Sequence, residues 1–201
     1  MKAVWAFMLI TACGAAQQAD APEYAAFGGV ALCGDPAIRG EVVGDYPGDG
    51  DCGIVGAARV TSVAGVELST PALITCPTAR ALKAWVENGV RPAVGRTGGG
   101  VASLRVAAHY SCRSRNNQPG TRLSEHSFGR AIDIAAIGLR DGTELSVLND
   151  WNSTENGARM RRMWQAACGP FGTVLGPDAD RFHQDHFHFD TANYRSGSYC
   201  R

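Results

Sequence analysis

The residues Ser124–Asp133 read SEHSFGRAID, and the residues His183–Asp190 read HQDHFHFD. Four of the chain's five histidines lie in these two short segments. In an extended strand, successive side chains point to opposite faces, so Asp133 would point away from the isoleucines on either side of it. By the same rule the second segment has two phenylalanines on one face and three polar groups on the other: His186, His188 and Asp190. The sequence therefore predicts two strands, each with one apolar face and one face of metal-ligating groups.

The three side chains best suited to hold one metal ion are His126, Asp133 and His188. A catalytic zinc takes three nitrogen, oxygen or sulfur ligands from the protein and keeps a fourth corner for water. Gly129 can form the turn that brings His126 back over the strand containing Asp133. A single histidine would more simply be a core or surface residue, but this combination favours a metal site. Two histidines and a carboxylate also suit Fe(II), so the residues alone leave the metal's identity open.

Length and charge limit the other function classes. A chain of 201 residues fits one domain with an N-terminal extension and can bury a sizeable core. The 19 Lys and Arg residues balance the 19 Asp and Glu residues. This even charge gives no reason to expect nucleic acid as a partner.

The N-terminus predicts export. Lys2 is followed by the apolar run Ala3–Ile10, which is too short to span a bilayer because a spanning helix needs about 20 residues. We interpret residues 1–13 as a signal peptide. The residues Ile10–Cys13 resemble the lipobox of bacterial lipoproteins, in which case a lipid on Cys13 would anchor the protein to a membrane. The alternative is ordinary cleavage between Ala12 and Ala16, and both alternatives give an exported, periplasmic protein.

The remaining six cysteines predict disulfides, because an exported chain with an even number of cysteines normally pairs them. Zinc binding by thiolates is disfavoured, since no two of the six lie within a few residues of each other. The one pairing that we predict joins Cys33 to Cys52, which flank a segment rich in turn residues.

The rest of the chain predicts an α+β fold. Residues 14–28 read as a flexible leader, residues 29–75 as a β-rich N-terminal extension with short hairpin strands, and residues 76–201 as the main domain. Pro77 can open a helix that Gly89 and Pro92 would end, and a second helix would begin at Ser153 or Thr154. We expect a small antiparallel sheet with helices on one side, the metal cleft across its open face, and disulfides stabilising the fold.

The motif Ser124-x-His126-x-x-Gly129-x-Ala131-x-Asp133, paired with His186-x-His188, resembles a group of zinc peptidases. This group includes D-Ala-D-Ala carboxypeptidases, lysostaphin-like endopeptidases, murein endopeptidases and the hedgehog signalling domain. The stretch from Cys76 to Cys200 is more closely similar to the bacterial extensin-like C-terminal domain family. It contains five matching runs: Tyr110-x-Cys112-Arg113, SEHSFGRAIDI, Asp150-Trp151, FGTVLGP and HQDHFHFD.

The resemblance implies a role for each candidate residue. His126, Asp133 and His188 would bind Zn²⁺, His186 would stand beside the metal-bound water, and His183 would line the same cleft. Arg113 falls where the D-Ala-D-Ala peptidases place an arginine that holds the substrate carbonyl or carboxylate. Those carboxypeptidases carry a glutamate base where this chain has His186, so their mechanism does not transfer intact.

These expectations combine into one functional hypothesis and one rival. We expect an exported zinc metallopeptidase that hydrolyses amide bonds in peptidoglycan peptides, with His186 as general base and His183 or Arg113 stabilising the oxyanion. The rival is a non-catalytic zinc module that binds the cell wall. The hedgehog domain, which belongs to the group that this chain resembles, shows that such a scaffold can serve a non-catalytic role.

Overall fold

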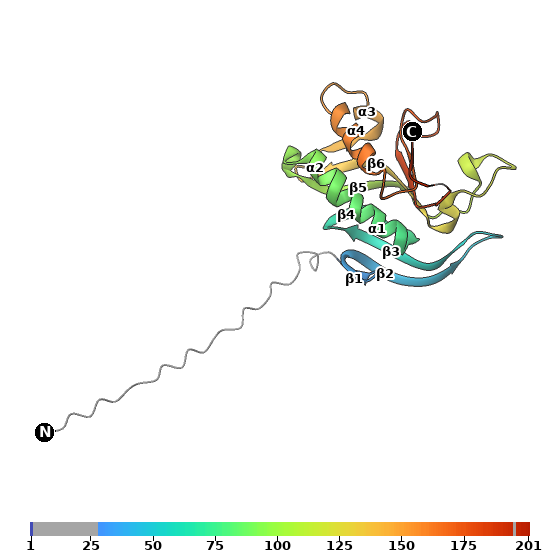
Figure 1. The fold of residues 1–201 in the computed structure, drawn as a ribbon, viewed down its shortest axis with the longest axis horizontal. Helices are drawn as coiled ribbons and strands as arrows, with labels where there is room; N and C mark the ends of the chain where they lie inside the picture. The colour runs from blue at the N-terminus through green and yellow to red at the C-terminus, as the bar shows by residue number, and fades with distance from the viewer. Residues whose placement is uncertain (2–27, 195) are drawn as a thin grey trace.

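The computed structural model describes residues 1, 28–194 and 196–201, and in them one mixed sheet organises the fold (Figure 1). The sheet has ten strands in the order β1-β2-β3-β4-β5-β6-β9-β8-β10, with β7 pairing with β6 off this path. The strands are β1 (Val30–Leu32), β2 (Asp35–Pro47), β3 (Gly53–Val63), β4 (Val66–Thr75), β5 (Val101–Ala108), β6 (Ala131–Leu139), β7 (Glu144–Ser146), β8 (Thr173–Leu175), β9 (Phe187–Asp190) and β10 (Tyr199–Cys200).

Few helices accompany this sheet, and most are short. They are α1 (Cys76–Trp85), the π-helical turn η2 (Val86–Val90), α2 (Arg91–Val94), α3 (Val147–Asp150), α4 (Gly157–Ala166) and three 3₁₀ turns, η3 (Thr97–Gly99), η4 (Arg115–Asn117) and η5 (Glu125–Phe128). None of the helices in the described residues is long and apolar enough to cross a membrane.

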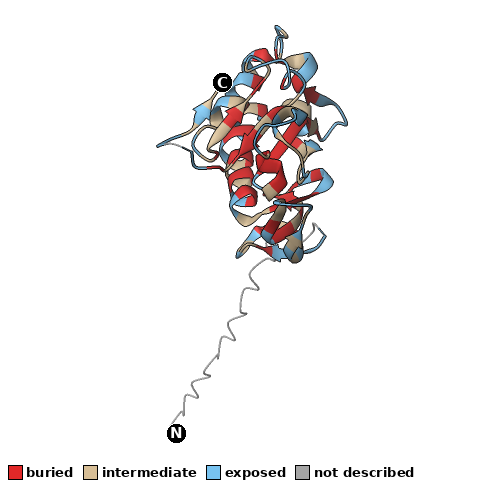
Figure 2. Cartoon of the chain, turned by 90° about the vertical axis from the view of Figure 1, so that its right-hand side faces the viewer, coloured by how far each residue is buried: buried red, intermediate tan, exposed pale blue. Residues whose placement is uncertain are grey.

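The two faces of the central strands have different surroundings. On one face, Trp85 of α1 packs edge-on against Phe189 of β9, and Trp151 packs against Phe187 in the same way. The indole nitrogen of Trp85 donates a hydrogen bond to the carbonyl of Met163 in α4 (2.7 Å), which ties the two helices together. Figure 2 shows the buried residues gathered at the centre of the domain. The helices therefore cover one face of β6 and β9 and leave the other face for a site.

The sheet differs from the small antiparallel sheet that we expected. It is large, and it contains two parallel pairings, β4 with β5 and β8 with β10. The helical segment between β4 and β5 supplies the long crossover that parallel neighbours need, since a tight turn can join only antiparallel strands. The strands of residues 29–75 pair into this same sheet, because β4 lies beside β5.

The predicted disulfide between Cys33 and Cys52 is wrong. These cysteines lie at opposite ends of β2, whose 13 residues span about 40 Å at roughly 3.3 Å per residue, whereas bridged Cα atoms lie within about 7 Å. Three disulfides form in the described residues, and their Cα–Cα distances are 5.3, 5.6 and 6.2 Å: Cys33–Cys76, Cys52–Cys112 and Cys168–Cys200.

The first helical segment also runs further than predicted. Gly89 and Pro92 do not end it, because the chain continues through η2 into α2. Pro92 lies in the first turn of α2, directly after the π-helical turn η2, and a Cβ on Gly89 would lie 2.8 Å from the Cβ of Ala166 in α4. Gly89 thus permits close helix packing instead of stopping the helix.

Several N-terminal expectations concern residues 2–27, which lie outside the described residues. They are the signal peptide, the lipobox at Cys13 and most of the leader predicted for residues 14–28.

Candidate metal centre

His126 is held over the sheet by a short, capped turn. The Ser124 hydroxyl accepts a hydrogen bond from the backbone N–H of His126 at the start of η5, and Gly129 ends η5 in the left-handed conformation (φ 62°). A Cβ on Gly129 would lie 2.5 Å from Cδ1 of Ile54, so the close packing of this turn requires glycine. The carbonyl of Gly129 accepts from the backbone N–H of Thr75 (2.9 Å), which anchors the turn to the end of β4.

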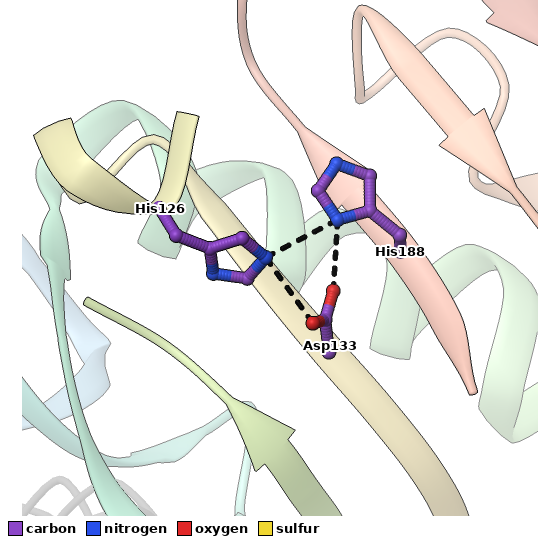
Figure 3. A group of neighbouring side chains, drawn as sticks. All are labelled: His126, Asp133 and His188. Atoms are coloured by element: carbon purple, nitrogen blue, oxygen red, sulfur yellow. Dashed lines mark hydrogen bonds and ion pairs between the residues drawn. The ribbon is translucent and has the colours of Figure 1, made fainter. Parts of the chain in front are cut away.

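Asp133 and His188 face His126 from two neighbouring strands. They are directly paired residues of β6 and β9, so their side chains project from the same face of the sheet. Figure 3 shows all three side chains converging. Nδ1 of His188 lies 2.8 Å from Oδ1 of Asp133, and Nε2 of His126 lies 3.2 Å from both Oδ2 of Asp133 and Nδ1 of His188.

The donor set fits a divalent cation. Ligand atoms held at about 2.1 Å from a tetrahedral zinc lie about 3.4 Å apart, which is close to the separations seen here. Nδ1 of His126 donates to the backbone carbonyl of His109 (2.7 Å), so in the neutral imidazole Nε2 presents a lone pair to the other two residues. Nε2 of His188 points instead to Oδ2 of Asp190 (3.4 Å), and this contact orients Nδ1 toward Asp133. The cluster is thus rich in acceptors that a cation would satisfy.

The pKa shifts of Asp133 and His188 arise from burial and from the contacts within this site. Burial alone would raise the pKa of Asp133, but the imidazoles of His126 and His188 hold that pKa well below its usual value. Burial alone would lower the pKa of His188, but the hydrogen bonds and charges of Asp133 and Asp190 raise it to about 9. Without a metal, His188 therefore carries a proton at neutral pH, and a metal ion would have to displace that proton.

A pocket of about 450 Å³ opens above the three residues, and every candidate residue from the sequence lines it. Nε2 of His186 lies 3.6 Å from Oδ2 of Asp133. His183 is buried, and its ring centre lies 5.3 Å from that of His186 and 5.6 Å from that of His188. Arg113 reaches the pocket from the loop after β5, where its backbone N–H donates to the buried Ser127 hydroxyl (3.0 Å). The structure thus brings all six sequence-derived candidates together.

The sequence did not indicate a polar network around the buried Glu125 at the same pocket. Glu125 is buried and accepts a hydrogen bond from the hydroxyl of Tyr194. Arg130 lies 3.3 Å and Arg115 3.7 Å from the Glu125 carboxylate. Tyr194 follows β9 with no motif around it, so the only signal in the sequence was its closeness to HQDHFHFD.

One protein-family model matches nearly all of the described part of the chain. The family model described as "Extensin-like protein C-terminus" matches residues 37–201, a range that begins within β2 and takes in all later strands. No curated protein and no solved structure gave a match. The chain therefore belongs to the family of the extensin-like protein C-terminus.

Proposed function

We propose that this protein is an exported zinc-dependent peptidase that hydrolyses amide bonds in peptidoglycan peptides. The observation that carries the proposal is the convergence of His126, Asp133 and His188 at the floor of an open pocket. The resemblance of the motifs to zinc peptidases supports the reaction class. The periplasm expected from the N-terminal sequence supports the substrate, because peptidoglycan crosslinks are the amides at hand there.

In this proposal the three residues hold Zn²⁺ through Nε2 of His126, a carboxylate oxygen of Asp133 and Nδ1 of His188. Zinc in such a site supplies a Lewis acid that polarises the scissile carbonyl and activates water. The sheet fixes two of the ligands, and the hydrogen bonds from His126 to His109 and from His188 to Asp190 fix the ring orientations.

In this proposal His186 acts as the general base. Its Nδ1 lies 2.8 Å from Oδ1 of the exposed Asp185, and a proton shared there leaves the lone pair of Nε2 facing the metal site. That nitrogen can accept a proton from the attacking water and return it to the leaving amine. Asp185 then acts as a positioning residue, because it selects the tautomer of His186.

Arg113 is better suited than His183 to stabilise the oxyanion. Nδ1 of His183 donates to Oδ1 of Asp180 (2.7 Å), and burial lowers the pKa of His183, so its Nε2 has no proton to donate near neutral pH. The guanidinium of Arg113 is always charged, and no side-chain hydrogen bond or ion pair occupies it within residues 28–194 and 196–201. It is therefore available to bind a developing negative charge or a substrate carboxylate.

The experiment measures zinc content and the release of peptides from purified peptidoglycan. Wild type should bind one zinc per chain and release peptide fragments. His186→Ala should keep the zinc and lose the activity by about 100-fold or more, as expected for a general base. His188→Ala should lose both zinc and activity, and Asp185→Asn should lose activity while keeping zinc.

Two outcomes would contradict the proposal. A zinc-loaded wild type that releases no peptide from any crosslinked substrate would favour the non-catalytic cell-wall binding module. Equal activity of wild type and His188→Ala would remove the metal from the reaction.

A further inference from the structure

Within the described residues, the large aromatic side chains that are exposed lie at the metal pocket. Eight large hydrophobic side chains are exposed in the described residues, and the three aromatic ones among them all line this pocket: Phe182 (37 %), Tyr194 (48 %) and Tyr199 (36 %). The five aliphatic ones, such as Leu148 at 62 %, do not line it. Exposed aromatic rings are costly in water, so their concentration around one pocket points to a ligand.

Strand register places Tyr199 at a defined distance from the metal ligands. Tyr199 of β10 pairs with Thr173 of β8, which pairs with Asp190 of β9, and two residues along Leu175 of β8 pairs with His188. Paired residues project from the same face, so the pocket floor continues from the metal ligands across β8 to Tyr199. Two strand spacings of about 4.8 Å separate β9 from β10, and Tyr199 lies two residues along from the row of His188, which puts Tyr199 about 12 Å from His188.

Polar groups accompany the aromatic rings on this side. The hydroxyl of Thr173 lines the pocket and makes no hydrogen bond to another described residue. Oδ1 of Asp180 accepts from His183 and from the backbone N–H of Phe182, whereas Oδ2 has no hydrogen-bond partner within the described chain. The β8–β10 side therefore combines aromatic rings with an unused carboxylate oxygen and a hydroxyl.

We propose that this side, defined by Thr173, Asp180, Phe182 and Tyr199, is a subsite for a sugar ring attached to the peptide substrate. An aromatic ring packs against the C–H face of a sugar, while carboxylate and hydroxyl oxygens bind the hydroxyl groups at its rim. An apolar peptide side chain would leave Asp180 and Thr173 unsatisfied on contact. The proposal rests on the proposed function and narrows its substrate to sugar-linked peptides.

The spacing also selects which amide is cleaved. An extended peptide advances about 3.4 Å per residue, so the roughly 12 Å between Tyr199 and His188 holds about three to four residues. The cleaved bond then lies within about four residues of the sugar, with the rest of the peptide running toward Arg113 in the loop after β5, across β9 and β6 from β10.

The test compares two probes on the zinc-loaded full chain: a disaccharide-linked peptide of peptidoglycan and the same peptide without the sugar. Binding is measured by calorimetry on the His186→Ala background, so that it does not depend on turnover. The sugar should improve Kd by about tenfold or more. Tyr199→Ala should remove most of that gain and leave Kd for the sugar-free peptide unchanged, and Thr173→Val should remove a smaller part.

Leu148→Ala is the matched control, because it shortens an exposed hydrophobic side chain that does not line the pocket. It should leave both Kd values unchanged. If Tyr199→Ala does not fold, as checked by thermal unfolding, Phe182→Ala answers the same question. Equal Kd values for the two probes, or equal losses for both in Tyr199→Ala, would overturn the sugar subsite. Failure of the proposed function would instead appear as binding without cleavage in the wild type.

Discussion

Zinc binding should become steadily tighter as pH rises above 7, because the metal competes with a proton on His188. The pKa of an ordinary histidine is about 6.5, whereas Asp133 and Asp190 raise that of His188 to about 9. Between pH 7 and pH 8.5 the fraction of chains with His188 deprotonated rises about 25-fold, which corresponds to about 2 kcal/mol of binding free energy. For a histidine ligand with a pKa of 6.5, the deprotonated fraction would rise only about 1.3-fold over the same pH range.

The assay is a competition titration of zinc against a chelator of known affinity at each pH, on the purified oxidised chain. Calorimetry at pH 7.5 in buffers with different heats of ionisation gives the number of protons released when zinc binds. Release of a proton shows that zinc displaces the proton on His188. Asp190→Asn is the matched control, because it removes one carboxylate that raises the pKa of His188 and should flatten the dependence. An affinity that changes less than twofold from pH 7 to 8.5 in the wild type would refute this account.

Three further predictions concern stability and the substrate. The free energy of unfolding of the metal-free chain should fall by about 3 kcal/mol between pH 6.5 and 9.5. The reason is that the raised pKa of His188 stabilises the folded state only while the proton is bound. Urea titrations would measure the loss, with His188→Gln as the control. Gly129→Ala should lower the free energy of unfolding by about 2 kcal/mol, because the new Cβ would lie 2.5 Å from Cδ1 of Ile54. It should also weaken zinc binding, because η5 would have to move. A Tm equal to that of the wild type would contradict this prediction. Replacing Cys52 and Cys112 by serine should lower the free energy of unfolding by about 4 kcal/mol, because the disulfide spans a sequence separation of 60 residues. It should also raise KM, because the loop that carries Arg113 is then less restrained. An unchanged KM in the folded variant would show that the disulfide does not position the loop.

The sequence was most informative where the alternation of side chains along a strand separated apolar residues from metal-ligating ones. Alternation in HQDHFHFD placed Phe187 and Phe189 in the core and His188 on the pocket face, because a strand between a helix layer and an open face has only that arrangement. The turn at Gly129 was predictable for the same local reason. These features depend on neighbours in the chain, so a single sequence contains them.

Features that depend on distant parts of the chain could not be read in this way. The pairing of Cys33 with Cys76 depends on how far β2 extends, and the place of Tyr199 depends on its parallel pairing with β8. The hydrogen bond between Glu125 and Tyr194 joins the 3₁₀ turn η5 to a loop after β9 that carries no motif. In each case the contact follows from the assembled sheet and loops, which local patterns do not specify.

The most direct test of the central claim is the anomalous scattering of zinc in crystals of the zinc-loaded chain. We expect a single strong peak within bonding distance of Nε2 of His126, a carboxylate oxygen of Asp133 and Nδ1 of His188. A peak at any other place, or none at these three residues despite bound zinc in solution, would contradict the metal centre and the chemistry proposed from it.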